Sequence, residues 1–132
     1  MVILDTNVLI DHIRLNRIGG KSILDLLAQK LNINDFSISI ISVQELFIGR
    51  SMENKNESAY VKDLLSEMNI MPYVFSTAAL AGVLMRKSKD MLDFADAAIA
   101  ATCLENEYEL CTLNLKHFTN ISSLKVFDLK TL

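Results

Sequence analysis

The sequence has little of what would divide it into parts or attach it to a membrane. One proline, Pro72, and four glycines in 132 residues leave no linker, and no repeat or low-complexity tract is present. No apolar run approaches the roughly 18 residues needed to cross a bilayer, and no basic-then-apolar signal segment opens the chain. We therefore expect one domain over residues 1–132, located in the cytoplasm and without membrane contact.

Cysteine and positive charge are also scarce. Cys103 and Cys111 lack CxxC spacing and have no further zinc ligands arranged around them, so we expect two buried, reduced thiols. Thirteen Lys and Arg against sixteen Asp and Glu give a formal charge of -3. This balance excludes nucleic-acid binding by bulk electrostatic attraction alone. A polyanionic ligand would need a local basic patch or metal ions that neutralise some of the acids.

Hydrophobic residues are plentiful, at 51% of the chain with a mean hydropathy of +0.28. A chain of this length can complete a core and still leave apolar surface for a partner subunit. The composition therefore predicts self-association.

Short apolar segments alternate with segments of helical period. We expect strands at residues 1–4, 36–41, 71–75, 110–113 and 125–129. We expect helices at residues 6–14, 23–31, 42–49, 59–68, 77–86 and 94–105, with Ser42 and Glu45 as a capping box and Ser76 or Thr77 as a cap. Strands that alternate with helices indicate an α/β fold with a mainly parallel sheet and helices on both faces.

Polar residues follow several of the expected strands. In parallel sheets the loops that leave the carboxyl ends of the strands form the binding crevice. Three groups lie at such ends: Asp5, the segment from Ser42 to Glu45, and the segment 112–114. Asp93 and Asp96 form a fourth group at the start of a helix rich in small residues.

Each of these acids also has a purely structural interpretation. Asp5 could cap a helix, Glu45 could complete a capping box with Ser42, and Asp93 and Asp96 could complement a helix dipole. Caps need not converge, however, whereas all these groups should meet at one sheet edge. Converging carboxylates repel each other unless a cation lies between them, and oxygen ligands without His or Cys favour Mg²⁺ or Mn²⁺. The pattern therefore predicts a metal site formed by Asp5, Glu45 and Asp96, with Asp93 as a further candidate one helical turn before Asp96.

Four segments resemble, in order and spacing, the motifs of the PIN-domain family, and in particular the VapC toxins of type II toxin–antitoxin pairs. They are V-I-L-D-T-N-V-L-I-D at 2–11, S-I-I-S-V-Q-E-L-F-I-G at 39–49, D-A-A-I-A-A-T at 96–102 and T-L-N-L-K-H-F at 112–118. The resemblance implies a three-layer α/β/α sandwich and an Mg²⁺- or Mn²⁺-dependent endoribonuclease that hydrolyses RNA phosphodiester bonds. It also implies a homodimer that a small antitoxin protein inhibits.

Carried over by position, the family's acids fall on Asp5, Glu45 and Asp96, and its fourth position falls on Asn114. Asn114 lacks the charge often found there, although its amide oxygen can accept a hydrogen bond or orient a metal-bound water. Asp93 could replace the missing charge. Thr6 and Thr112 match polar family positions and could hydrogen-bond to a carboxylate or a water.

The alternatives differ in what they require of these residues. A haloacid dehalogenase-like phosphatase needs a second Asp at the position of Asn7, and a receiver domain needs a phosphoacceptor Asp where Ser42 and Glu45 follow the second strand. A PIN-like domain that binds RNA or protein without cleaving stays open, because Asn114 and the net acidity favour it.

Substrate contacts would come from scattered basic residues, and the two histidines are interpreted first as structural or surface residues. The candidate phosphate contacts are Arg14, Arg17, Lys21, Arg50, Arg86, Lys87 and Lys116, and the histidines are His12 and His117.

Overall fold

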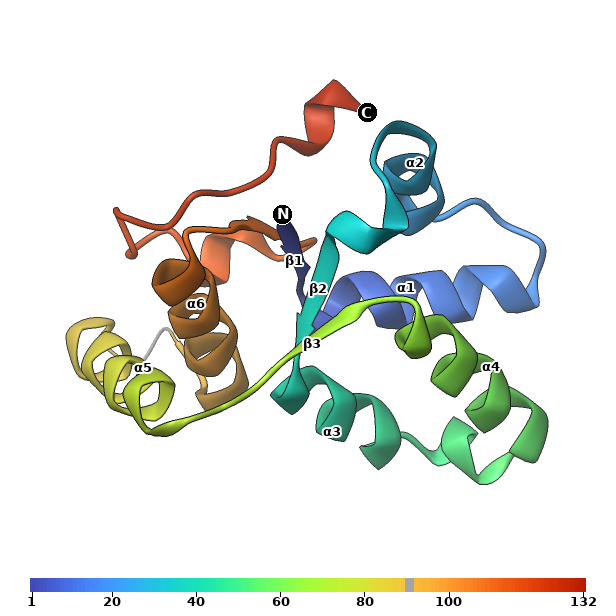
Figure 1. Cartoon of the computed structure of the whole chain (residues 1–132), viewed down its shortest axis with the longest axis horizontal. Helices are drawn as coiled ribbons and strands as arrows, with labels where there is room; N and C mark the ends of the chain where they lie inside the picture. Colours follow the sequence, from blue (N-terminus) through green and yellow to red (C-terminus); the bar gives the residue numbers. More distant parts are fainter. Residues whose placement is uncertain (90–91) are drawn as a thin grey trace.

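A four-stranded parallel sheet forms the centre of the protein (Figure 1), whose computed structural model describes residues 1–89 and 92–132. The strands are β1 (Val2–Leu4), β2 (Phe36–Ser39), β3 (Asn69–Met71) and β4 (Glu109–Cys111), in the order β3-β2-β1-β4. All three neighbouring pairs are parallel. The predicted parallel sheet is confirmed, and its carboxyl edge gathers the ends of β1, β2 and β4.

In the described part of the chain, six α-helices connect and cover the strands. They are α1 (Thr6–Arg17), α2 (Ile23–Lys30), α3 (Ile40–Ile48), α4 (Lys55–Ser66), α5 (Phe75–Lys87) and α6 (Phe94–Asn106). Four short 3₁₀ turns complete the described structure: η1 (Ile33–Asp35), η2 (Arg50–Glu53), η3 (Leu115–His117) and η4 (Leu129–Thr131). None of the helices in residues 1–89 and 92–132 combines the length and apolar character that spanning a membrane requires.

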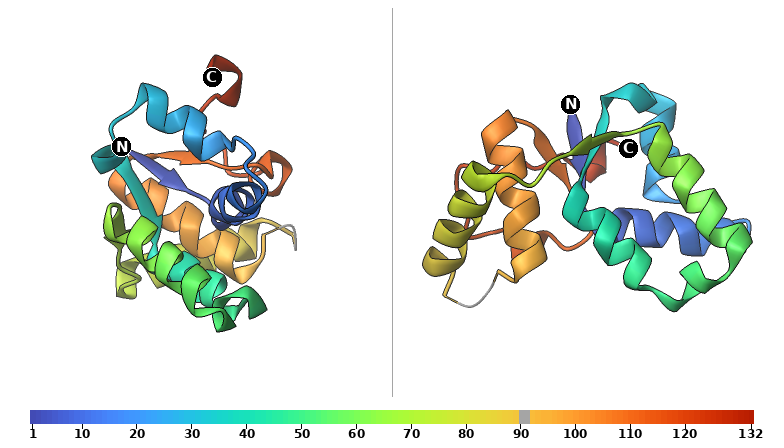
Figure 2. Two further views of the ribbon diagram at one scale, coloured as in Figure 1. Left: turned by 90° about the vertical axis from the view of Figure 1, so that its right-hand side faces the viewer. Right: turned by 60° about the horizontal axis from the view of Figure 1, so that its bottom comes forward.

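Two hydrophobic cores lie on opposite faces of the sheet, because successive side chains of a strand point to opposite sides. Val2 and Leu4 of β1 pack in the core with α1, α2 and α4, whereas Ile3 packs with α5 and α6. The right-hand view of Figure 2 shows α5 and α6 on one side of the strands and α1, α3 and α4 on the other. The predicted three-layer α/β/α sandwich is confirmed.

The second predicted strand, at 36–41, is two residues too long. β2 stops at Ser39, whose hydroxyl accepts a hydrogen bond from the Ile41 amide at 3.1 Å and caps α3. Ser42 therefore lies inside the helix, and the predicted capping box with Glu45 does not form.

The third predicted strand, at 71–75, is displaced. β3 occupies Asn69–Met71, and Phe75 already belongs to α5. Val74 stands at the cap position of α5 without a side-chain hydrogen bond, so neither Ser76 nor Thr77 is the predicted cap.

The last predicted strand, at 125–129, is reduced to one bridge. Val126 pairs with Leu110 of β4: the Leu110 amide donates to the Lys125 carbonyl, and the Phe127 amide donates to the Leu110 carbonyl, both at 2.8 Å. Beyond this bridge the chain turns into η4. The C-terminal segment is therefore fastened to the outer edge of β4 without extending the sheet.

Both cysteines are buried and free, as the sequence predicts. Burial raises the pKa of each thiol to about 12. The thiolate, which is the reactive form, is thereby suppressed at neutral pH.

Candidate active site

Asp5 lies at the carboxyl edge of the sheet, between the end of β1 and the start of α1. It occupies the cap position of α1, but its side chain makes no capping hydrogen bond. Its carboxylate Oδ2 instead accepts a hydrogen bond from the Thr112 hydroxyl at 2.7 Å, and only 4% of the residue is exposed. The purely structural interpretation of Asp5 as a helix cap is therefore wrong.

Thr112 follows β4 and holds Asp5 through a small network. Its hydroxyl oxygen accepts hydrogen bonds from the Asn114 amide at 3.0 Å and from the Asn7 side chain at 3.4 Å. The Leu113 amide donates in turn to Asn7 Oδ1 at 3.2 Å. The predicted bond between Thr112 and a carboxylate is confirmed. Asn7, for which the sequence predicted no role in the site, joins the start of α1 to the exit of β4.

Glu45 reaches the same edge from α3. The Thr6 hydroxyl donates to Glu45 Oε1 at 2.6 Å, and the hydroxyls of Thr6 and Ser42 lie 2.8 Å apart. Thr6 and Ser42 are buried, whereas Glu45 is half-buried. The predicted bond between Thr6 and a carboxylate is thus confirmed, and Glu45 is held beside Asp5 by the residue next to it.

The two acids of α6 have different surroundings. Asp93 is exposed and caps the helix, because its Oδ1 accepts a hydrogen bond from the Asp96 amide at 2.8 Å. Asp96 is 9% exposed, and its Oδ2 lies 3.0 Å from His117 Nδ1. The structural interpretation of Asp93 as a helix-terminal acid is confirmed, but its negative charge still lies close enough to affect Asp5 and Asp96.

Asn114 is connected to Asp96 through His117. The side-chain nitrogen Nδ2 of Asn114 lies 2.9 Å and 3.0 Å from the two ring nitrogens of His117. From the sequence, His117 was predicted to be a structural or surface residue and not a member of the site. Its place in the segment 112–118, three residues after Asn114 and hence about one turn away, is the signal that could have found it.

The carboxylates act on one another electrostatically. Burial is the main cause that raises the pKa of Asp5; the charges of Glu45 and Asp93 add to it, and hydrogen bonds from Thr112 and the Thr6 backbone oppose it. Burial also raises the pKa of Asp96 to about 6, with contributions from the charges of Asp93 and Asp5 and opposition from His117. A cation bound among these groups would relieve the repulsion.

The donor set fits a hydrated hard cation. In residues 1–89 and 92–132, no three His, Cys, Asp or Glu side chains lie so that together they could hold a metal ion. Mg²⁺ does not need three such side chains, since it usually keeps several waters and binds through one or two carboxylates. The oxygen donors and their mutual repulsion match that chemistry better than zinc chemistry.

Two of the candidate phosphate contacts lie on the surface in ion pairs, and one of the two histidines lies in the core. Arg14 and Arg17 of α1 form ion pairs with Asp11 and Glu57, so their charges are already compensated. His12 is buried, with its ring nitrogens 2.7 Å from Ser22 Oγ and 2.8 Å from the Tyr60 hydroxyl. The structural interpretation of His12 is confirmed.

The raised pKa of Asp96 predicts an unusual dependence of stability on pH in metal-free protein. Because the folded state binds this proton more tightly than the unfolded state, the free energy of unfolding should rise as pH falls from 7.5 through 6 towards 4.5. Asp96→Asn should remove much of this slope and raise the melting temperature at pH 7.5 by about 3–6 °C. Calorimetry in EDTA at pH 7.5 and at pH 4.5 measures the melting temperature and the free energy of unfolding of both proteins.

The matched control is Asp63→Asn, which changes an exposed acid of α4. It should retain the wild-type slope. An Asp96→Asn protein as pH-dependent as the Asp63→Asn protein would contradict the prediction.

The fold and the site define a class: an α/β/α domain with buried carboxylates at the carboxyl edge of a parallel sheet. The model of the PIN domain family matches residues 2–122, and the chain belongs to this family. Ribonuclease VapC10 of Mycobacterium tuberculosis is 31% identical over 128 residues, which cover 95% of this chain and 91% of the relative. Ribonuclease VapC1 of Methanocaldococcus jannaschii is 30% identical over 134 residues, with 96% and 87% covered. A solved toxin–antitoxin complex from Klebsiella pneumoniae contains a similar chain, with a TM-score of 0.77, 25% identity and 98% of each chain covered.

Proposed function

We propose that this protein is a divalent-metal-dependent endoribonuclease and the toxin of a VapBC-type toxin–antitoxin pair. The observation that carries the proposal is the pair of buried acids, Asp5 and Asp96, at one edge of the sheet, where burial first and neighbouring acids second raise the pKa of both carboxyl groups. The family membership and the relatives named ribonucleases support it. We infer that residues 1–132 act as one domain in the cytoplasm, where RNA is the substrate.

In this proposal Asp5, Asp96, Glu45 and Asp93 would together surround a hydrated Mg²⁺ or Mn²⁺, which would bind directly to only one or two of these carboxylates. The metal, when bound, supplies a water of lowered pKa and stabilises charge on the attacked phosphoryl group. The remaining work of the chain is to position these oxygens. The Thr112 hydroxyl fixes Asp5, and the Thr6 hydroxyl fixes Glu45.

His117 and Asn114 position the carboxylate of Asp96 in the proposed site. His117 Nδ1 contacts Asp96 Oδ2, and Asn114 contacts the His117 ring. Asn114 therefore acts through His117 and Asp96, as a positioning residue. This arrangement explains how an amide can stand at the fourth position without disrupting the site.

Cleavage of a structured RNA by the purified protein tests the function. We expect decay in Mg²⁺ or Mn²⁺ and none in EDTA, with activity restored when excess metal is added back. Decay at the same rate in all three conditions would rule out the proposed enzyme. Metal-independent binding without decay would instead support the non-cleaving PIN-like domain that the net acidity and Asn114 favour.

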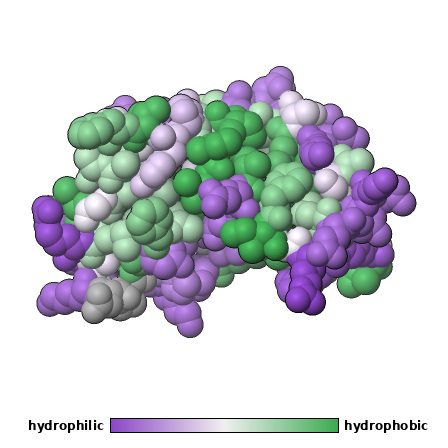
Figure 3. Space-filling view, turned by 90° about the horizontal axis from the view of Figure 1, so that it is seen from below, coloured by the Kyte–Doolittle hydropathy of each residue, from purple (hydrophilic) through white to green (hydrophobic). Residues whose placement is uncertain are grey.

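We also propose a homodimer, on the basis of exposed apolar side chains. Ile48 of α3 is 73% exposed and Phe75, at the start of α5, is 91% exposed. Figure 3 shows hydrophobic side chains gathered across the underside of the molecule, which is the side where Figure 1 draws α3 and α5. Exposed apolar surface of this kind marks protein contacts.

A small antitoxin is the second proposed partner, because the similar chain from Klebsiella pneumoniae belongs to a toxin–antitoxin complex. A cavity of about 220 Å³ lies between α1 and α3 and is lined by apolar side chains such as Ile10 and Leu46. Glu45 also lines it. A partner bound there would lie against one of the proposed metal ligands, and so could inhibit the enzyme.

A further inference from the structure

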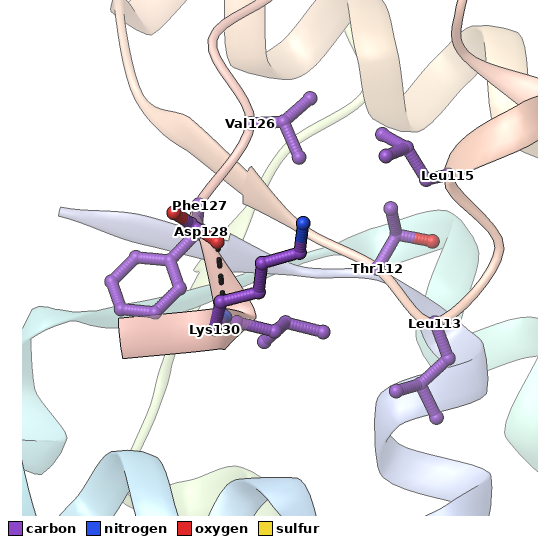
Figure 4. A pocket seen from close by; sticks show the side chains of 8 residues that line it. Thr112, Leu113, Leu115, Val126, Phe127, Asp128 and Lys130 are labelled. Carbon is purple, nitrogen blue, oxygen red and sulfur yellow. Dashed lines mark hydrogen bonds between the residues drawn. The ribbon is translucent and has the colours of Figure 1, made fainter. Parts of the chain in front are cut away.

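A cavity of about 430 Å³ opens on the outer side of β4, where Thr112 lines it. One wall comes from the loop after β4, with Thr112 and Leu115, and the other comes from the C-terminal segment, with Val126, Asp128 and Lys130. Figure 4 shows these side chains around an open centre, towards which the amino group of Lys130 extends. The volume lies in the range of pockets that bind small organic groups.

The C-terminal wall is fastened to the sheet. The hydrogen bonds on both sides of Val126 tie it to Leu110 of β4. Asp128 Oδ1 accepts a hydrogen bond from the Lys130 amide at 3.0 Å, and the Lys30 ammonium group donates to the Thr131 carbonyl. The cavity is therefore preformed between two attached segments.

Thr112 belongs both to the cavity and to the carboxylate site. Its hydroxyl donates to Asp5, while the residue lines the cavity. β4 is the neighbour of β1 in the sheet, and neighbouring strands lie about 4.8 Å apart. A nucleotide in the cavity would therefore adjoin a phosphodiester bond held at Asp5.

The lining has the chemistry of a nucleobase site. Leu115 and Val126 provide apolar walls, and Asp128 keeps one carboxylate oxygen that the hydrogen bond to Lys130 does not use. Among the described residues, Lys130 forms no ion pair, so its ammonium group is available for a phosphate. Single-stranded RNA is recognised through splayed-out bases that meet apolar surfaces and hydrogen-bonding groups, with cations on the phosphates.

We propose that this cavity binds one base of the RNA beside the scissile bond and sets the base preference of cleavage. The inference rests on the proposed ribonuclease function. Lys130 contacts the adjoining phosphate, and Asp128 accepts a hydrogen bond from the base.

Two variants on opposite walls test the proposal. Leu115→Trp fills the cavity from an exposed position, and Lys130→Ala removes the cation. Their matched controls are Ile18→Trp, at the exposed end of α1, and Lys62→Ala on the exposed face of α4. A pool of random-sequence RNA is cleaved with Mn²⁺, the cut ends are sequenced, and KM and kcat are measured on one preferred oligonucleotide.

We expect Leu115→Trp to lose the wild-type base preference at the position next to the cut, whereas Lys130→Ala, which removes only a phosphate contact, should weaken binding of all sequences alike and keep that preference. KM should rise about tenfold, the usual contribution of one base contact, while kcat changes little. The two controls should keep the wild-type profile and KM. Cavity variants with the profile and KM of their controls would overturn the inference, and would be the expected result if the cavity received a protein side chain instead.

RNA binding by the Asp5→Asn protein separates this inference from the proposed function. Its affinity for oligonucleotides that differ in one base is compared with that of the Asp5→Asn/Leu115→Trp protein. If the Asp5→Asn protein shows a base preference and the Asp5→Asn/Leu115→Trp protein does not, the cavity assignment would be supported even if the wild-type protein did not cleave RNA. Equal affinities of the two proteins for every oligonucleotide would overturn it even if the wild-type protein did.

Discussion

Replacing Asp5 by asparagine is expected to lower RNA cleavage about a thousandfold, which corresponds to about 4 kcal/mol of transition-state stabilisation. Asparagine retains the size of the side chain and an oxygen that can accept the Thr112 hydrogen bond at 2.7 Å. It removes the negative charge that we propose binds the metal. The loss should therefore fall on catalysis and metal affinity, while the fold is retained.

The same substitution should make the metal-free protein more stable. Burial raises the pKa of Asp5, and the nearby charges of Glu45 and Asp93 raise it further, so the charged form is disfavoured in the folded state at neutral pH. Removal of the charge relieves that cost. Added Mn²⁺ should raise the melting temperature of the wild-type protein but hardly that of the Asp5→Asn protein.

Initial rates of RNA cleavage at saturating Mn²⁺, together with melting curves with and without the metal, measure both effects. Asp63→Asn, on the exposed face of α4, is the matched control and should behave as the wild-type protein does. Cleavage by the Asp5→Asn protein within tenfold of the wild-type rate would exclude Asp5 from the reaction centre.

The acids at the sheet edge could be predicted because one topological rule places them. A parallel sheet brings the ends of its strands to one edge, so Asp5 and Thr112 were expected at the same edge although they are 107 residues apart, and the position of β4 next to β1 makes them neighbours. Their hydrogen bond follows from this topology and from the residue types. Local sequence pattern contains no information about it.

The predicted capping box of Ser42 and Glu45 was wrong because the end of β2 was placed two residues too late. Ile40 and Ile41 continue the apolar pattern of β2, but the hydroxyl of Ser39 caps α3 and begins the helix there. A difference of two residues changes the role of Glu45 from a local cap to a partner of Thr6, 39 residues away. Such a change lies within the usual uncertainty of helix ends.

His117 was not predicted because its role depends on contacts remote in sequence. It lies in the 3₁₀ turn η3, and its partner Asp96 lies 21 residues earlier on α6. A lone histidine has no periodicity that would show its partner. Only the packing of α6 against the β4 side of the sheet brings the two together.

The largest loss of stability is expected from Phe36→Ala, which truncates a fully buried side chain of β2. Such truncations cost about 3–5 kcal/mol. Because the stability of a domain is typically only about 5–15 kcal/mol, the melting temperature should fall by about 10–15 °C. Phe94→Ala is the matched control, since Phe94 is 68% exposed and its loss should change stability by less than about 1 kcal/mol. Denaturant titration of both variants measures the difference.

Below its melting transition, the Phe36→Ala protein should cleave RNA at a rate within a few fold of the wild-type rate. Phe36 pairs with Val2 in the core shared with α1, α2 and α4, whereas the carboxylates are fixed by the hydroxyls of Thr6 and Thr112. A folded but inactive protein would show that this core also sets the geometry of the acids. The Asp5→Asn protein should be stable but inactive, and the Phe36→Ala protein should be active but unstable. Together these results would separate the contribution of the sheet to stability from its contribution to catalysis. The buried face of the sheet provides the free energy that holds the mutually repelling acids together at its edge.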